Sequence, residues 1–94
     1  MDDITKQSAL IFKALGDERR AEILFRLTGG EHSASSLINA LGIAQPTFSH
    51  HMKQLCGCGI VRERKIGRAV FYSLDQEGAK NARRILKQLT KPKV

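Results

Sequence analysis

The residues best suited to chemistry form one face of a short segment in the middle of the chain. If Phe48, Met52 and Leu55 are the buried stripe of a helix, the polar residues between them must point outward. Amide, hydroxyl and imidazole groups bond to base edges, and a lysine binds phosphate. An ordinary solvated surface is the alternative. The spacing predicts a DNA-contacting face made of Gln45, Thr47, Ser49, His50 and Lys53, with His51 packed inward.

A second group with binding chemistry is a cluster of cations a few residues further along the chain. Two β-prone runs, residues 60–65 and 69–74, flank a turn that contains Gly67, which predicts a β-hairpin. A basic hairpin beside a DNA-contacting helix can lie along the phosphate backbone or enter the minor groove. A run of charge is otherwise only a solvated face. The predicted backbone contacts are Arg62, Arg64, Lys65 and Arg68.

Two thiols stand one residue apart, at Cys56 and Cys58. A disulfide between residues so close would be strained, so both thiols are expected to be reduced. Soft thiolates suit Zn²⁺, Cd²⁺ or As(III), but a stable site needs three or four ligands. A reversible thiol switch and simple packing of two small side chains are the alternatives. The sequence requires no cofactor, and a thiophilic metal or metalloid at this pair is one hypothesis.

Helical periodicity and capping residues define the elements that must position these groups. Helices are expected over residues 4–15, 18–28 and 34–41, and a fourth begins near Pro46 and ends at Gly57. The third and fourth are joined by a tight turn, as in a helix-turn-helix. A last helix follows Asp75. The predicted fold class is mainly α with a small β-hairpin, a winged helix-turn-helix of about five helices and a two-stranded wing.

Length and composition narrow the class of protein further. The 94 residues are expected to form a single domain, residues 1–94. Lys and Arg number 16 against 9 Asp and Glu, and the resulting net charge of +7 favours a polyanion such as double-stranded DNA as partner. No apolar run suits a membrane span or a secretory signal, so a cytoplasmic protein without a membrane partner is expected. No phosphate-binding loop or nucleophile motif points to an enzyme.

Three segments of the chain resemble the ArsR/SmtB family of small winged-helix repressors. They are residues 14–20 (ALGDERR) with the Ile-Leu pair after them, residues 41–55 (LGIAQPTFSHHMKQL), and residues 59–74 around the predicted hairpin. The resemblance implies a homodimer, joined through its first and last helices, that binds an inverted-repeat operator and leaves it when an effector arrives. A 3-4-3 apolar spacing in the last helix agrees with helix pairing. The expected interface residues are Ile4, Ile11, Ala79, Ala82, Leu86 and Leu89.

The positions that resemble the family's sensor sites depart from its patterns. Arsenic- and cadmium-type members carry Cys-x-Cys at the start of the third helix, where this chain has Ser33 and Ser35. Cys58 alone resembles a ligand of another subgroup. The positions similar to zinc ligands of the last helix form a set unsuited to zinc, namely Asp75, Glu77, Gln88 and Lys91. The effector stays open, and a protein-interaction module or an architectural DNA-binding protein without sequence preference are alternative functions.

Overall fold

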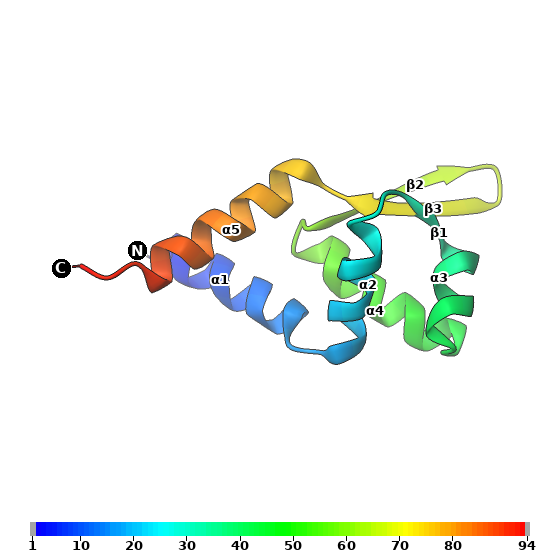
Figure 1. Ribbon diagram of the computed structural model, residues 1–94, viewed down its shortest axis with the longest axis horizontal. Helices are drawn as coiled ribbons and strands as arrows, with labels where there is room; N and C mark the ends of the chain where they lie inside the picture. The colour runs from blue at the N-terminus through cyan, green and yellow to red at the C-terminus, as the bar shows by residue number, and fades with distance from the viewer. Residues whose placement is uncertain (1, 94) are drawn as a thin grey trace.

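The computed structural model describes residues 2–93 of the 94-residue chain. Its elements follow in the order α1 (Asp2–Leu15), α2 (Glu18–Leu27), β1 (His32–Ser33), α3 (Ala34–Leu41), α4 (Gln45–Gly57), β2 (Val61–Ile66), β3 (Ala69–Leu74) and α5 (Gln76–Thr90). The molecule is elongated, with extents of 50 × 22 × 22 Å. Helices α1 and α5 lie side by side at one end, and the β2–β3 hairpin projects at the other (Figure 1).

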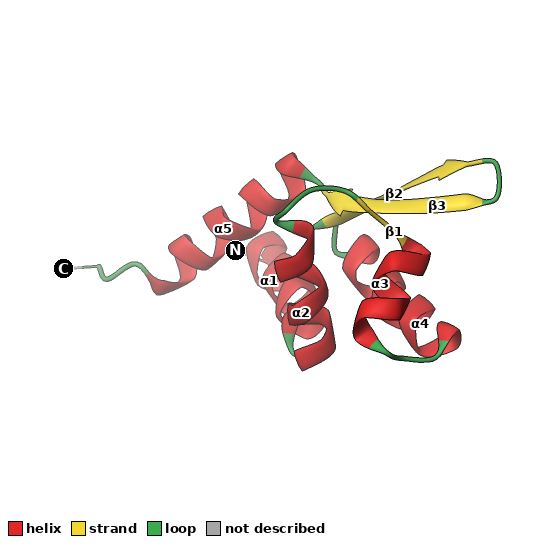
Figure 2. Cartoon of the chain, turned by 45° about the vertical axis from the view of Figure 1, so that its right-hand side comes forward, coloured by secondary structure: helices red, strands yellow, loops and turns green. Residues whose placement is uncertain are grey.

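The predicted winged helix-turn-helix is confirmed by this arrangement. Helices α3 and α4 pack beneath the hairpin, while α5 extends to the opposite side (Figure 2). Helices α2, α3 and α5 begin at the side-chain caps that the sequence contains, because Asp17, Ser33 and Asp75 each accept a bond of 3.1 Å or less from the backbone amide three residues on. Helix α4 has no such bond at Ala44 and relies on Pro46 in its first turn. Within residues 2–93, no helix is both long and apolar enough to cross a bilayer.

The sheet has three strands where two were expected. Strand β1 pairs antiparallel with β3, so the order is β1-β3-β2, and His32 lies opposite Tyr72. Two residues are too short to show the alternation that marks a strand, and Ser33 also caps α3, so the sequence indicated only a loop and a cap. Smaller corrections are that α1 begins at Asp2 rather than near Ile4, and that β2 covers Val61–Ile66.

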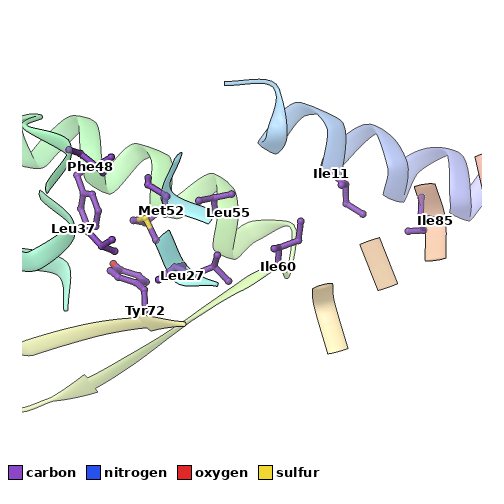
Figure 3. Packing of buried hydrophobic residues seen from close by; sticks show 12 residues of the cluster. Ile11, Leu27, Leu37, Phe48, Met52, Leu55, Ile60, Tyr72 and Ile85 are labelled. Atoms are coloured by element: carbon purple, nitrogen blue, oxygen red, sulfur yellow. The ribbon is translucent and has the colours of Figure 1, made fainter. Parts of the chain in front are cut away.

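The core lies where α4 meets the sheet and continues between α1 and α5. Phe48 and Met52 lie on the side of α4 that faces Tyr72 of β3, and Leu55, further along α4, is buried in the same cluster (Figure 3). The Phe48 and Tyr72 rings meet edge to face, with centroids 5.8 Å apart. This packing confirms the inward stripe read from the sequence, and it fixes which face of α4 remains exposed.

The second part of the core corrects one residue of the expected dimer interface. Ile11 of α1 is buried against Ile85 of α5 within the same chain (Figure 3). Its exposed fraction is 5%, so it has almost no surface left to offer to a second copy. The spacing predicted an apolar contact surface correctly, but periodicity does not tell whether the partner helix belongs to the same chain or to another.

Candidate nucleic-acid interface

The five polar residues predicted on the outer face of α4 are all exposed. His51, one residue after His50, is buried together with the apolar stripe. Helix α4 lies under the hairpin (Figure 2), and hollows lined by Ser49 and Lys53 with Glu63, and by Gln45 with Arg68, place this face beside the hairpin. The exposed set is Gln45, Thr47, Ser49, His50 and Lys53.

The start of α4 and the tip of the hairpin enclose a common hollow. Its volume is about 320 Å³, and its walls come from the end of β1, α3, the first residue of α4, the hairpin turn and the start of β3. Gln45 and Arg68 both line it, so the structure brings the beginning of the helical face close to the hairpin tip. A hydroxyl, an amide and a guanidinium around one hollow form a polar, cationic surface suited to the oxygen atoms of a nucleic acid.

The cations of the hairpin fall into two groups with different surroundings. Arg64 makes a two-pronged ion pair with Glu31, at 2.7 and 3.0 Å, and its guanidinium lies 5.2 Å from the centre of the Phe71 ring. The pair lowers the pKa of the Glu31 carboxyl, chiefly through the hydrogen bond from Arg64. Arg64 therefore fastens β2 across β3 to the residue before β1, a role that the sequence did not indicate.

The remaining hairpin cations make no two-pronged ion pair with another described residue. No ion pair between described residues involves Arg62 or Arg68, and both side chains are exposed. Lys65 lies 3.6 Å from Glu63, but its side chain is 70% exposed, so this contact is weak in water. Three of the four predicted cations thus remain available for phosphates, and Arg64 is committed to the sheet.

A second hollow, between α4 and β2, contains the first cysteine. Its volume is about 270 Å³, and Cys56, Glu63 and Tyr72 are among its lining residues. The Tyr72 hydroxyl donates to Glu63 at 3.1 Å, and burial together with this carboxylate raises the pKa of Tyr72 to about 12. Burial, then the charge of Glu63, also raises the pKa of the Cys56 thiol. Cys56 is therefore protonated at neutral pH, the form in which a thiol is a poor nucleophile and a poor metal ligand.

The second cysteine opens to a different part of the surface. Cys58 donates from its sulfur to the Leu55 carbonyl at 3.3 Å, and it lines a hollow with Leu10 and Lys13 of α1. The structure thus does not bring the two thiols to one shared hollow. Among the described residues there is no group of three or more His, Cys, Asp or Glu side chains placed to hold a metal ion. Ser33, which stands where members of the resembled family carry a cysteine, caps α3.

Helices α1 and α5 leave several apolar side chains in solvent. Of the predicted interface set, Leu86 and Leu89 are 50% and 47% exposed, whereas Ile4, Ala79 and Ala82 are half-buried. Sequence reasoning named only Ile4 and Ile11 of the first helix as interface residues and missed three more apolar side chains. These exposed residues of α1 are Leu10, Phe12 and Leu15. Together with Leu86 and Leu89 they are called the α1–α5 apolar surface below.

A helix-turn-helix whose second helix exposes a polar face beside a basic hairpin defines the class of winged-helix DNA-binding proteins. Comparison with known proteins narrows the class. The profile described as "Bacterial regulatory protein, arsR family" matches residues 17–63. The chain belongs to this family, and it is a DNA-binding transcription regulator.

Individual relatives support the assignment over most of the chain. A cadmium resistance transcriptional regulatory protein, a CadC homolog of Staphylococcus aureus, is 39% identical over 83% of this chain and 69% of its own length. The arsenical resistance operon repressor of Staphylococcus xylosus is 42% identical over 77% of this chain and 69% of its own. A crystal structure of an ArsR-family transcriptional regulator superimposes with a TM-score of 0.81 at 29% identity, covering 93% of this chain and 90% of that one.

Proposed function

We propose that this regulator is a homodimeric repressor that binds an inverted-repeat operator and is released from it by an effector. The observation that carries the proposal is the exposed polar face of α4 beside the exposed cations Arg62, Lys65 and Arg68 of the hairpin. The α1–α5 apolar surface of the same chain supports the homodimer. The name of the staphylococcal arsenical repressor supports repression. Residues 1–94 would act as one DNA-binding domain, in the cytoplasm where a bacterial chromosome lies.

Dimerisation through the α1–α5 apolar surface would give the protein two copies of α4 related by a two-fold axis. A symmetric dimer reads a sequence that is itself symmetric, so an inverted repeat with one half-site per α4 is the expected operator. Burying half-exposed leucines supplies favourable free energy to a small protein whose own core is limited.

The contacts divide by the chemistry of the side chains. Gln45, Thr47, Ser49 and His50 carry the groups that discriminate bases in the major groove. Lys53, Arg62, Lys65 and Arg68 carry charge without base selectivity and would hold phosphates. Arg64 would serve the interface indirectly, because its bond to Glu31 holds the hairpin in place.

Selection of DNA from a random-sequence pool tests the proposal. We expect the enriched duplexes to share an inverted repeat and to bind with a steep dependence on salt concentration. Enrichment without a common sequence would favour an architectural DNA-binding protein. Failure to bind any duplex, together with weak salt dependence, would favour a protein-interaction module.

Replacing Arg68 with alanine is expected to weaken binding to operator and to unrelated DNA by the same factor. Each lost phosphate contact lowers the salt slope by about one, so the dimer should lose about one per protomer. Anisotropy titrations at several salt concentrations measure both effects. Arg64→Ala is the matched control: it should lower the melting temperature more and the salt slope less, because Arg64 bonds to Glu31. A loss confined to the operator would contradict the phosphate assignment of Arg68.

The effector would be a thiophilic metal or metalloid held by one thiol, either Cys58 or Cys56 after the loss of its proton, because the two thiols line different hollows. The names of the cadmium and arsenical relatives support this class of ligand. Adding As(III) or Cd²⁺ to the DNA complex is then expected to release the wild type and to spare Cys56→Ser/Cys58→Ser. Because the thiols open into different hollows, the single variants should show which one supplies the ligand. Equal release of wild type and double variant would contradict a cysteine sensor.

A further inference from the structure

A single guanidinium joins three helices near the centre of the molecule. Arg20 of α2 donates from Nε to the Ala14 carbonyl at 2.6 Å and from Nη2 to the Lys13 carbonyl at 3.3 Å. Both carbonyls belong to the last turn of α1, where the helix itself supplies no donor. The third bond runs from Nη1 of Arg20 to Nδ1 of His51 on α4, at 3.1 Å. Arg20 therefore ties the end of α1 to the middle of the helix that faces DNA.

The bond to Arg20 defines the protonation state of His51. Arginine has only donors, so Nδ1 of His51 must accept, and the ring must be neutral with its proton on Nε2. His51 is buried, with 7% of the residue exposed, and it sits in the middle of the 13-residue helix α4. Its neighbour His50 is exposed on the proposed base-reading face. A change at His51 is thus one residue away from the DNA contacts.

The charges around His51 oppose its protonation with one exception. Arg19 and Arg20 of α2 disfavour a positive charge on His51, and His50 of α4 does the same. The exception is Asp17, the N-cap of α2, whose Oδ1 lies 3.9 Å from Nδ1 of His51. No charged group of α1 is among the causes of the pKa shift of His51, and α1 is linked to the ring through the two carbonyls that Arg20 binds. Burial is the largest effect, and the pKa of His51 lies below the usual range of an imidazole.

We propose that Arg20 and His51 are positioning residues for DNA recognition: the neutral imidazole fixes α4 against the end of α1, and its protonation releases α4 from that setting and weakens sequence-specific binding. A protonated Nδ1 would point a donor at a donor, and the only acceptor at hand would be Asp17. The imidazole would then exchange its bond to Arg20 for one to the cap of α2. This inference rests on the proposed DNA-reading function.

The direction in which acid changes DNA binding distinguishes the release of α4 from a general electrostatic effect. Protonation of an exposed histidine beside DNA adds positive charge and tightens binding to any duplex. Release of α4 acts in the opposite direction and only on the duplex that α4 reads. The ratio of the two affinities therefore reports on His51, and the affinity for unrelated DNA reports on the charge of the protein as a whole.

The experiment compares a duplex selected by the wild type with a scrambled duplex, between about pH 7.5 and about pH 4.5, because the pKa of His51 lies below that of an ordinary imidazole. For the wild type we expect the preference to fall by about three- to tenfold toward acid, the equivalent of one hydrogen bond. His51→Asn places an acceptor, Oδ1, near the position of Nδ1 but does not titrate. It should keep the preference at pH 7.5 and lose the pH dependence. His51→Leu should lose preference at every pH.

Two controls keep the outcomes distinct. Melting curves at each pH show that every variant is folded where it is titrated, and the scrambled duplex reports how the charge of the whole protein changes binding with pH. A His51→Asn variant with the wild-type pH profile would overturn the inference and leave the proposed function standing. A wild type without preference for any duplex would overturn both. In the free protein, nitrogen NMR should find the proton on Nε2 of His51, and a proton on Nδ1 would overturn the inference without any DNA.

Discussion

Replacing both Leu86 and Leu89 with glutamate is expected to give a monomer whose affinity for the operator is lower by about a hundredfold or more. The two leucines are about half exposed on α5 and form part of the α1–α5 apolar surface. Four carboxylates at a two-fold interface would repel one another and would have to leave water. Once the dimer is lost, the two half-sites no longer share one binding event, and avidity of this kind contributes factors of about 10²–10⁴. Sedimentation and anisotropy titration measure the two losses.

An apolar residue elsewhere on the surface provides the matched control for this prediction. Phe25 of α2 is 78% exposed, more than either leucine, but belongs to neither α1 nor α5. Phe25→Glu should therefore leave both the dimer and operator binding unchanged. If Leu86→Glu/Leu89→Glu sediments as a dimer at the same concentration as the wild type, the α1–α5 apolar surface is not the interface. If the wild type and both variants are all monomers, the proposed dimer and the proposed inverted-repeat operator are both wrong.

The parts of the interface that depend on local spacing could be predicted from the sequence. The stripe of Phe48, Met52 and Leu55 determines the outer face of α4, because a helix turns by a fixed angle per residue. The same reasoning placed His51 inside before its partners were known. Caps at Asp17, Ser33 and Asp75 were visible for a similar reason, since a cap acts on an amide only three residues away.

The parts that depend on contacts between distant residues could not be predicted in this way. Arg64 looked like one more exposed cation, and its partner Glu31 is 33 residues away. Arg20 and His51 are 31 residues apart, and nothing local marks either as the end of a hydrogen bond. Ile11 illustrates a different limit. Its apolar character was evident, but whether it is covered by α5 of its own chain or by a second copy depends on how the helices pack.

Of the Gly→Ala substitutions possible at the 8 glycines of this chain, Gly78→Ala is expected to lower the stability most. A Cβ at this position of α5 would overlap the carbonyl group of Gly59, in the loop between α4 and β2. The obstacle is backbone, which cannot turn aside as a side chain would. The amide of Asp75 also donates to the Ile60 carbonyl at 2.8 Å, so the start of α5 is held against this loop. We expect the free energy of unfolding to fall by about 1–3 kcal/mol, as for overpacked cores.

Gly57→Ala supplies the comparison that makes this loss interpretable. Gly57 is the last residue of α4, its φ is not positive, and an added Cβ would meet nothing within 4 Å. The substitution should stabilise the protein slightly, by less than about 1 kcal/mol, through helix propensity alone. Urea unfolding of the two variants and the wild type measures the difference. Equal stability of both variants would mean that α5 is free to move away from Gly59. A large loss in Gly78→Ala alone would mean that α5, which carries the proposed dimer contacts, is fixed to the end of α4, so the spacing between two copies of α4 depends on this glycine.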